Sequence, residues 1–399
     1  MNMQFFGEGD WVSTLIWFLM FFVFIMFYPR LMIKQLIWKL ETEVEEFEKW
    51  DRESRVYVAK RMRKDYNKDI QEAVDHFSEM FAIGPVDLDP AGIIKKLDHI
   101  IKNQRDRFRE FVEHLSDSKD EEKRKNFEAG LSVAMGMHQV TKVIRHYLEI
   151  TKKYNNLQFA MLLQMQIPMI KDIMKALRRG VKNMTEGEPV GDSIGPMVAA
   201  SFMTKKPKEL KEDELVYTEE NINGKKCVVV KPKGPGARVG DMGKGMIKLI
   251  EKYKPERIIT IDAAGKLEGE KEGSTAEGVG VAMGGSGVER YYIEEKATKR
   301  RIPLDAIAIK MRPENAISAM TEGVFRAFEE ARALVKKNVD RAKKGPVLIL
   351  GVGNTSGIGN HEKSLEEAKK IIQKNIKRMK SEEAEEKKKR SIWDSLSPF

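Results

Sequence analysis

The residues best placed to do chemistry stand directly after predicted β-strands or at the start of predicted helices. Asp262 ends a strand predicted for Arg257–Asp262, and Asp192 opens a helix predicted for Ile194–Met203. In open α/β sheets, ligands bind at the carboxyl ends of the strands, where loops and helix N-termini converge. We therefore expect both carboxyl groups at one ligand site. The alternatives are that Asp192 only caps its helix and that Asp262 only begins a turn.

Two glycine-rich segments would bring main-chain amides to the same edge of the sheet. One runs from Gly273 to Gly287, and the other is Gly351-Val-Gly-Asn354, directly after a predicted strand. Such amides, together with helix N-termini, suit an anionic ligand. The candidate ligand-binding residues are Gly280, Gly284, Gly285, Gly351, Gly353, Asn354 and Lys266. Nicotinamide dinucleotide binding is disfavoured, because no later strand supplies a ribose-binding acid.

His361 is the only histidine after residue 146, and it follows the second glycine-rich segment closely. We expect it to be either a site residue or a plain surface histidine. The sequence contains no Walker motif, no zinc-spaced Cys/His set and no nucleophile-elbow serine, which removes the commonest phosphate, zinc and serine-hydrolase signatures.

The candidate residues belong to a C-terminal region, residues 186–380, in which short β-branched runs alternate with helical patterns. Alternation of this kind predicts a three-layer α/β domain with a largely parallel sheet and helices on both faces. The predicted strands are Lys226–Val230, Arg257–Asp262, Asp305–Lys310 and Val347–Leu350. The predicted helices are Ile194–Met203, Gly243–Tyr253, Pro313–Lys337 and His361–Lys380. Residues 381–399 are expected to form a charged, flexible tail.

Residues 31–185 read as an all-helical domain. A continuous helix is predicted from 31 to about 75, with Leu36, Leu40, Val44 and Phe47 on one apolar stripe. Three further helices are predicted over residues 91–115, 120–153 and 157–184, the first of them after a turn at Gly84-Pro85 and Asp89-Pro90. The apolar part of the last helix is too short for a membrane span, so we expect a buried core helix.

Residues 1–30 are expected to form an N-terminal transmembrane anchor. The eighteen residues 11–28, WVSTLIWFLMFFVFIMFY, carry no charge and would cover about 27 Å as a helix, close to the ~30 Å hydrocarbon layer of a bilayer. The acidic start and the bulky, aromatic run favour an uncleaved anchor over a secretory signal. Residues 1–10 contain no Lys or Arg, whereas Arg30, Lys34 and Lys39 follow the run. The positive-inside rule therefore predicts a single-pass protein of the cell membrane, N-terminus outside and bulk cytoplasmic.

Composition agrees with a cytoplasmic bulk. The 399 residues include a single cysteine, Cys227, so no disulfide can form within the chain. There are 71 Lys and Arg against 61 Asp and Glu, a net charge of +10, which suits anionic lipid headgroups or nucleic acid. Acidic residues interleave with the basic ones, so we find no specific nucleic-acid signal and favour a solvated surface. The helical region is also a candidate for oligomer contacts.

Three short motifs resemble landmarks of a known architecture. Gly191-Asp-Ser-Ile-Gly-Pro196, Ile261-Asp-Ala263 and Leu350-Gly-Val-Gly-Asn354 look like those of the hydrogenase-maturation peptidases and spore germination proteases, which share a phosphorylase/hydrolase-like fold. In those relatives the Gly-x-Gly-Asn strand comes first, whereas here it comes last. We expect a circular permutation, in which Val347–Leu350 lies beside the strand of Asp262 and brings Asn354 near Asp192.

That resemblance implies a pair of acids. In germination proteases, aspartates matched by Asp192 and Asp262 are implicated in cleavage, and in maturation peptidases the matching acids bind a metal. Two carboxylates held close cannot both ionise easily, so one would act as a general acid and the other as a base toward water. With a divalent metal the two would instead be ligands, and His361 would be a third.

Over nearly its full length, the chain resembles an archaeal single-pass membrane family of unknown function, which implies no activity. The sequence therefore leaves three hypotheses. The first is a membrane-anchored peptidase or hydrolase that uses a carboxylate pair. The second is a regulatory module that binds an anion or nucleotide without turning it over, and the third is a membrane scaffold. The expected partners are the bilayer, through residues 11–28, and a peptide or anionic ligand.

Overall fold

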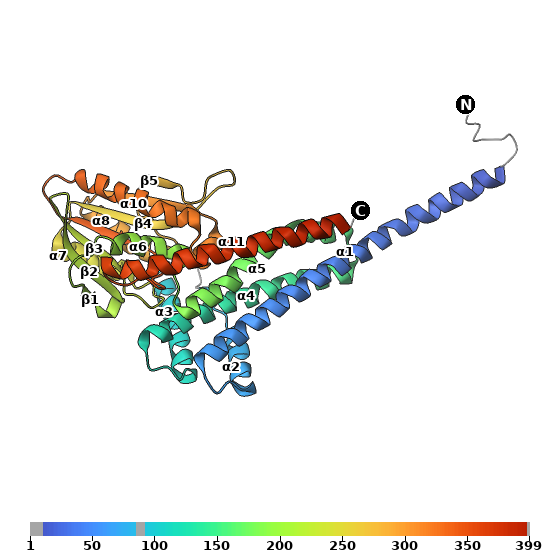
Figure 1. The fold of residues 1–399 in the computed structure, drawn as a ribbon, viewed down its shortest axis with the longest axis horizontal. Helices are drawn as coiled ribbons and strands as arrows, with labels where there is room; N and C mark the ends of the chain where they lie inside the picture. The colour runs from blue at the N-terminus through green and yellow to red at the C-terminus, as the bar shows by residue number, and fades with distance from the viewer. Residues whose placement is uncertain (1–10, 85–91, 397–399) are drawn as a thin grey trace, which may run out of the picture. The chain divides into compact units, whose positions relative to one another are not determined.

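The computed structural model describes residues 11–84 and 92–396 (Figure 1). The chain divides into two compact units. The first contains residues up to Arg52 together with Met137–Met174, and the second contains Glu53–Gly136 and the chain from Lys175 onward. The charge asymmetry of residues 1–10 and the predicted turn at Pro85 and Asp89-Pro90 lie outside the described residues.

The N-terminal half is helical, as predicted, but its first helix is divided differently. The structure has α1 (Trp11–Met62), α2 (Lys68–Ser78), α3 (Ile93–Leu115), α4 (Glu121–Tyr154) and α5 (Leu157–Glu186). The continuous helix predicted to residue 75 is therefore wrong, because α1 ends at Met62. The side chain of Asn67 caps α2 by accepting the amide hydrogen of Ile70, at 3.0 Å, which a residue inside a continuous helix would not do.

In the first unit, α1 packs against the end of α4 and the beginning of α5. The predicted apolar stripe is confirmed at Leu40, Val44 and Phe47, whose side chains are fully buried. Ion pairs surround this stripe: Arg145 of α4 binds Glu48 at 2.6 Å, and Lys171 of α5 binds Glu43 at 2.8 Å.

Helix α1 carries a stretch that is long and apolar enough to cross a membrane, by length and composition, and none of that stretch is buried. It is the one such helix among the residues that the structure describes.

The second unit contains a mixed sheet of seven strands in the order β1-β2-β3-β7-β4-β6-β5. The strands are β1 (Lys208–Leu210), β2 (Leu215–Ile222), β3 (Lys225–Pro232), β4 (Arg257–Gly265), β5 (Thr275–Val279), β6 (Leu304–Met311) and β7 (Val347–Gly351). All four predicted strands are present as β3, β4, β6 and β7, and these central strands run parallel. The expectation of a largely parallel sheet is nevertheless wrong, because β1, β2 and β5 pair antiparallel.

A short connection explains the antiparallel pairing of β2 with β3. Strands β2 and β3 are joined by Asn223-Gly224, both with positive φ (51° and 77°), the hairpin turn that Asn-Gly favours. Strand β5, Thr275–Val279, lies within the glycine-rich segment from Gly273 to Gly287, for which we predicted no strand, and it pairs antiparallel with β6.

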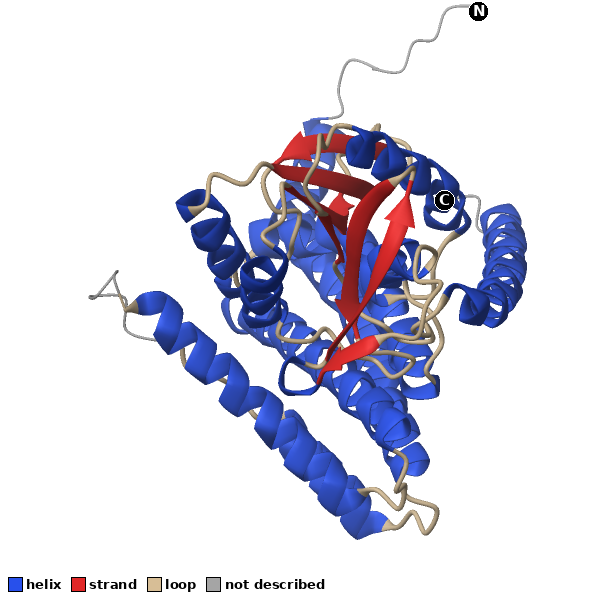
Figure 2. Ribbon diagram, turned by 90° about the vertical axis from the view of Figure 1, so that its left-hand side faces the viewer, coloured by secondary structure: helices blue, strands red, loops and turns tan. Residues whose placement is uncertain are grey.

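Helices cover both faces of this sheet (Figure 2). On β7, Val347 and Ile349 join a core cluster with α6 (Ile194–Ala200), α10 (Glu322–Asp340) and α11 (Leu365–Leu396). Leu348 and Leu350 join a second cluster with α7 (Met242–Tyr253) and α8 (Val288–Lys299). Successive side chains of a strand point to opposite faces, so β7 is buried on both sides.

Three helical predictions need correction. Helix α8 was not predicted, because its charged sequence shows no clear apolar stripe. The single helix predicted for Pro313–Lys337 is two helices, α9 (Pro313–Ile317) and α10, and Thr321 caps the second by accepting from the amide of Val324. Residues 381–396, expected to be a flexible tail, continue α11 instead.

Candidate functional site

Asp192 lies where the start of α6 meets the end of β7. It belongs to the short 3₁₀ helix η1 (Gly191–Ser193), directly before α6. The main-chain amide of Asn354, in the loop after β7, donates a hydrogen bond of 2.7 Å to Asp192 Oδ2. Gly195 permits this approach, because a Cβ there would stand 2.1 Å from the carbonyl oxygen of Val352. The carboxyl group is therefore held at the carboxyl end of the central strands.

Asp262 lies within β4, which continues to Gly265, and not at the strand end that we expected. The ladder between β4 and β7 stops at Ile261 and Gly351, so Asp262 is the first β4 residue beyond the end of β7. Its side chain is buried, with 4% exposed. Asp262 Oδ2 accepts from the amide of Gly284 at 2.9 Å, and Oδ1 accepts from its neighbour Ala263 at 2.7 Å.

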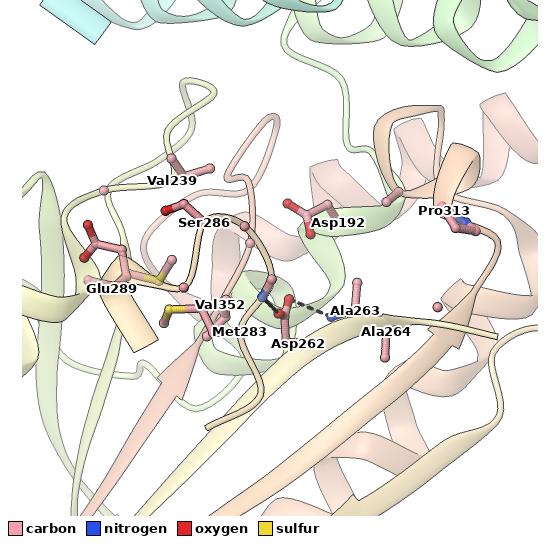
Figure 3. Close-up of a pocket in the computed structure, with 18 of the residues that line it drawn as sticks. Asp192, Val239, Asp262, Ala263, Ala264, Met283, Ser286, Glu289, Pro313 and Val352 are labelled. Carbon is pink, nitrogen blue, oxygen red and sulfur yellow. Dashed lines mark hydrogen bonds between the residues drawn. The ribbon is translucent and has the colours of Figure 1, made fainter. Parts of the chain in front are cut away.

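The two aspartates line the same cavity, which has a volume of about 630 Å³ (Figure 3). This volume lies in the range of small-molecule sites. Burial raises the pKa of the Asp192 carboxyl group. Burial and the neighbouring charge of Asp192 raise the pKa of Asp262 further. The two carboxyl groups therefore line one cavity and interact electrostatically.

The rest of the cavity wall is mostly apolar or main chain. It is formed by residues of several elements, among them Val239, Met242, Ala263, Ala264, Met283, Met311, Pro313, Ala316 and Val352. A third acidic residue, Glu289 of α8, also lines the cavity (Figure 3). Glu289 accepts a hydrogen bond from the amide of Gly243, and burial together with the nearby Asp241 raises its pKa to about 7. Sequence reasoning missed Glu289, because it missed the helix that carries it.

Of the predicted ligand-binding residues, the structure brings Gly284, Gly285 and Gly353 to the cavity. Gly353 has a φ of +127°, and a Cβ there would stand 2.1 Å from the carbonyl oxygen of Asp192. Glycine at this position therefore allows the loop after β7 to reach Asp192.

The other predicted ligand-binding residues have different contacts. Gly351 packs on α6, where a Cβ would stand 2.5 Å from Ala199, and Gly280 follows β5 in open space. Lys266 Nζ donates to the carbonyl oxygen of Leu267. The Asn354 side chain accepts from the amide of Ser356 at 2.8 Å, which shapes the loop. None of these four residues is among those that line the cavity.

The structure does not bring His361 to the two aspartates. Its Nδ1 accepts from the amide of Lys363 at the start of the 3₁₀ helix η3 (Glu362–Ser364), and Nε2 lies 2.8 Å from the carbonyl oxygen of Thr204. Both ring nitrogens are thus engaged with the main chain. Over residues 11–84 and 92–396, no group of three or more His, Cys, Asp or Glu side chains is arranged to hold a metal. The three-ligand set predicted around His361 does not fit this geometry.

Two family comparisons match most of the chain. Residues 14–187 match "Protein of unknown function (DUF1512) N-terminal domain", and residues 190–359 match "Domain of unknown function (DUF1512) C-terminal". No protein with a curated description matches the chain.

Proposed function

We propose that this chain, which belongs to the DUF1512 family, is a membrane-anchored hydrolase whose catalytic residues are Asp192 and Asp262. The observation that carries the proposal is the shared cavity, in which one carboxyl group raises the pKa of the other. Two interacting carboxyl groups with raised pKa values suit general acid–base catalysis near neutral pH.

The two residues would take different roles. The pKa of Asp262 is raised more than that of Asp192, so Asp262 would hold the shared proton and Asp192 would be the carboxylate. The water oxygen attacks the substrate's carbonyl carbon while Asp192 takes a proton from the water. Asp262 gives its proton to the carbonyl oxygen. When the carbon–nitrogen bond breaks, the proton on Asp192 passes to the leaving nitrogen and Asp262 recovers its own.

A peptide or another amide is the substrate class that we favour. The cavity wall is largely apolar and carries three acidic side chains, Asp192, Asp262 and Glu289, against the single basic residue Arg105 among the described lining residues. Such a wall disfavours an anionic ligand and suits a neutral or cationic one. The resemblance of three motifs to the maturation peptidases and germination proteases points to the same class.

The anion-binding alternative is less well supported. An anion would need free main-chain amides in the glycine-rich loops. The amide of Gly284 already donates to Asp262, and that of Asn354 already donates to Asp192. The carboxyl groups thus use two of the main-chain donors that an anion would require.

Anchoring rests on α1. We infer that its exposed apolar stretch crosses the membrane, with the N-terminus outside and the bulk of the chain in the cytoplasm, because the basic residues of α1 follow the apolar run. The unit that contains Asp192 and Asp262 would then be tethered to a membrane.

Peptide hydrolysis by the full-length protein in detergent tests the proposal. The protein is incubated with a synthetic peptide library in heavy-oxygen water, and mass spectrometry then detects new carboxyl ends that contain the heavy isotope. We expect cleavage by the wild type and none by Asp262→Asn. Equal cleavage by both proteins, or tighter binding of inorganic phosphate by Asp262→Asn without any wild-type cleavage, would overturn the proposal.

A further inference from the structure

The beginning of α5 presents an apolar face to solvent. Residues 154–170 contain no charged side chain. In α5, Phe159, Leu162, Met165 and Met169 follow at spacings of three or four residues, which places them on one side of a helix. Their exposed fractions are 47%, 58%, 73% and 57%. The buried core helix that we predicted here is therefore wrong for this side, although Ala160 and Ile167 on the other side are buried.

At the closed end of the α4–α5 hairpin, the aromatic side chain of Tyr154 is also exposed, by 66%. We call Tyr154, Phe159, Leu162, Met165 and Met169 the hairpin face. A contiguous exposed surface of large apolar side chains marks a contact with another apolar partner.

Ion pairs within the first unit place the hairpin face near the membrane end of α1. Lys152, close to the hairpin end, binds Glu41, whereas Arg145, two turns earlier in α4, binds Glu48. Helix α4 therefore runs antiparallel to α1, and its last residues lie beside the part of α1 that precedes Glu41. That part follows the apolar stretch directly, because the stretch ends near Tyr28.

The part of α1 that precedes Glu41 carries only positive charges. From Trp11 to Leu40, α1 contains no acidic residue, and its three charged residues are Arg30, Lys34 and Lys39. Lys34 and Lys39 are exposed. Lys153 lies beside Tyr154, with Nζ 5.5 Å from the ring centroid. Exposed lysines next to an apolar and aromatic surface are the pattern of a segment that lies in an anionic lipid surface.

We propose that the hairpin face inserts into the interfacial layer of the bilayer that α1 crosses. It then forms a second membrane contact, which fixes the orientation of the first unit at the lipid surface. The inference rests on the proposed anchoring by α1. A bilayer is favoured over a second copy of the chain, because the apolar surface continues toward the apolar stretch of α1 and because like-charged lysines beside it would repel their counterparts in a second copy.

Depth-dependent fluorescence quenching of the full-length protein tests the inference. The single cysteine is removed as Cys227→Ala, and one fluorophore is attached through Leu162→Cys on the hairpin face. Two comparison proteins carry the label through Phe21→Cys, within the apolar stretch, or through Lys142→Cys, an exposed position earlier in α4. The proteins are reconstituted in vesicles of equal parts phosphatidylcholine and phosphatidylglycerol. Circular dichroism melts verify that each variant folds.

We expect lipid-attached nitroxides to quench the label at position 162 at least about twofold more than the label at position 142, as for a face buried in the headgroup region. Strong quenching at position 21 with equal quenching at positions 162 and 142 would overturn the hairpin contact and leave the anchoring intact. Absence of lipid quenching at position 21 would overturn both. Disulfide dimers that form through Leu162→Cys in the vesicles would identify a second copy as the occupant and would also overturn the inference.

Discussion

The main-chain amide of Asn354 donates a 2.7 Å hydrogen bond to Oδ2 of Asp192, although 162 residues separate the two in the sequence. This bond joins the loop after the last strand, β7, to the first helical turn of the α/β region. It orients the Asp192 carboxyl group and, because it favours the ionised form, partly offsets the effect of burial on the pKa. Two placements expected from the sequence are present in the structure: β7 lies beside β4, and Asn354 lies near Asp192.

Gly353→Ala is expected to destabilise the α/β domain. The added Cβ would stand 2.1 Å from the Asp192 carbonyl oxygen, and the φ of +127° disfavours any side chain. We expect a loss of more than about 2 kcal/mol in the free energy of unfolding, measured by denaturant titration. Gly284→Ala is the matched control, because its Cβ would meet nothing within 4 Å; its effect should stay within about 0.5 kcal/mol. Equal effects of the two substitutions would contradict this role of Gly353.

Asp262→Asn should flatten the dependence of stability on pH. Burial and the charge of Asp192 raise the pKa of Asp262 from 3.8 to about 8, so the folded state keeps a proton that the unfolded state releases. This contribution to stability is fully present below pH 3.8 and is lost as the pH rises through about 8. Denaturant titrations across this pH range should therefore show a steeper fall for the wild type than for the variant.

Asparagine also loses one hydrogen bond, because both oxygens of Asp262 accept from amides. This adds a cost of about 1 kcal/mol that does not depend on pH. The test therefore compares how steeply the free energy of unfolding changes with pH, and a constant difference between the two proteins does not count. Parallel curves for the two proteins would mean that Asp262 does not titrate in this range.

Asp192→Asn should lower the pKa of Asp262 without restoring its ordinary value. The variant removes the neighbouring negative charge, whereas burial, the larger cause of the raised pKa, remains. The asparagine oxygen can still accept from the amide of Asn354, so the loop should stay in place. Infrared spectroscopy of the protonated carboxyl group across pH measures the change. An unaltered Asp262 pKa would show that the two carboxyl groups do not interact.

His361→Ala should weaken the fold slightly without affecting the cavity. The variant loses the bond from the Lys363 amide, and loss of a helix cap costs about 1 kcal/mol. His361→Asn keeps an acceptor for that amide and should recover most of the loss. Calorimetric titration with Zn²⁺ should give the same result for all three proteins. A weaker Zn²⁺ affinity in both variants would contradict this prediction and would identify His361 as a metal ligand.

Local patterns in the sequence were enough to identify the apolar stretch, the four central strands and the two aspartates. Both kinds of pattern, an uncharged run of eighteen residues and short β-branched runs followed by glycine, are local. They can therefore be recognised without knowing which distant residues are in contact. The placement of β7 beside β4 was predicted only from the resemblance of three motifs to a known fold.

Tertiary structure alone decided the rest of the site. Helix α8 has charged residues on most of its surface, and only its packing beside α7 brings Glu289 to the amide of Gly243 and to the cavity. His361 looked like a ligand because it follows a glycine-rich segment, but its ring contacts Thr204, 157 residues earlier. The raised pKa values of Asp192 and Asp262 likewise depend on burial and on proximity across the fold, two quantities that arise only when distant segments pack together.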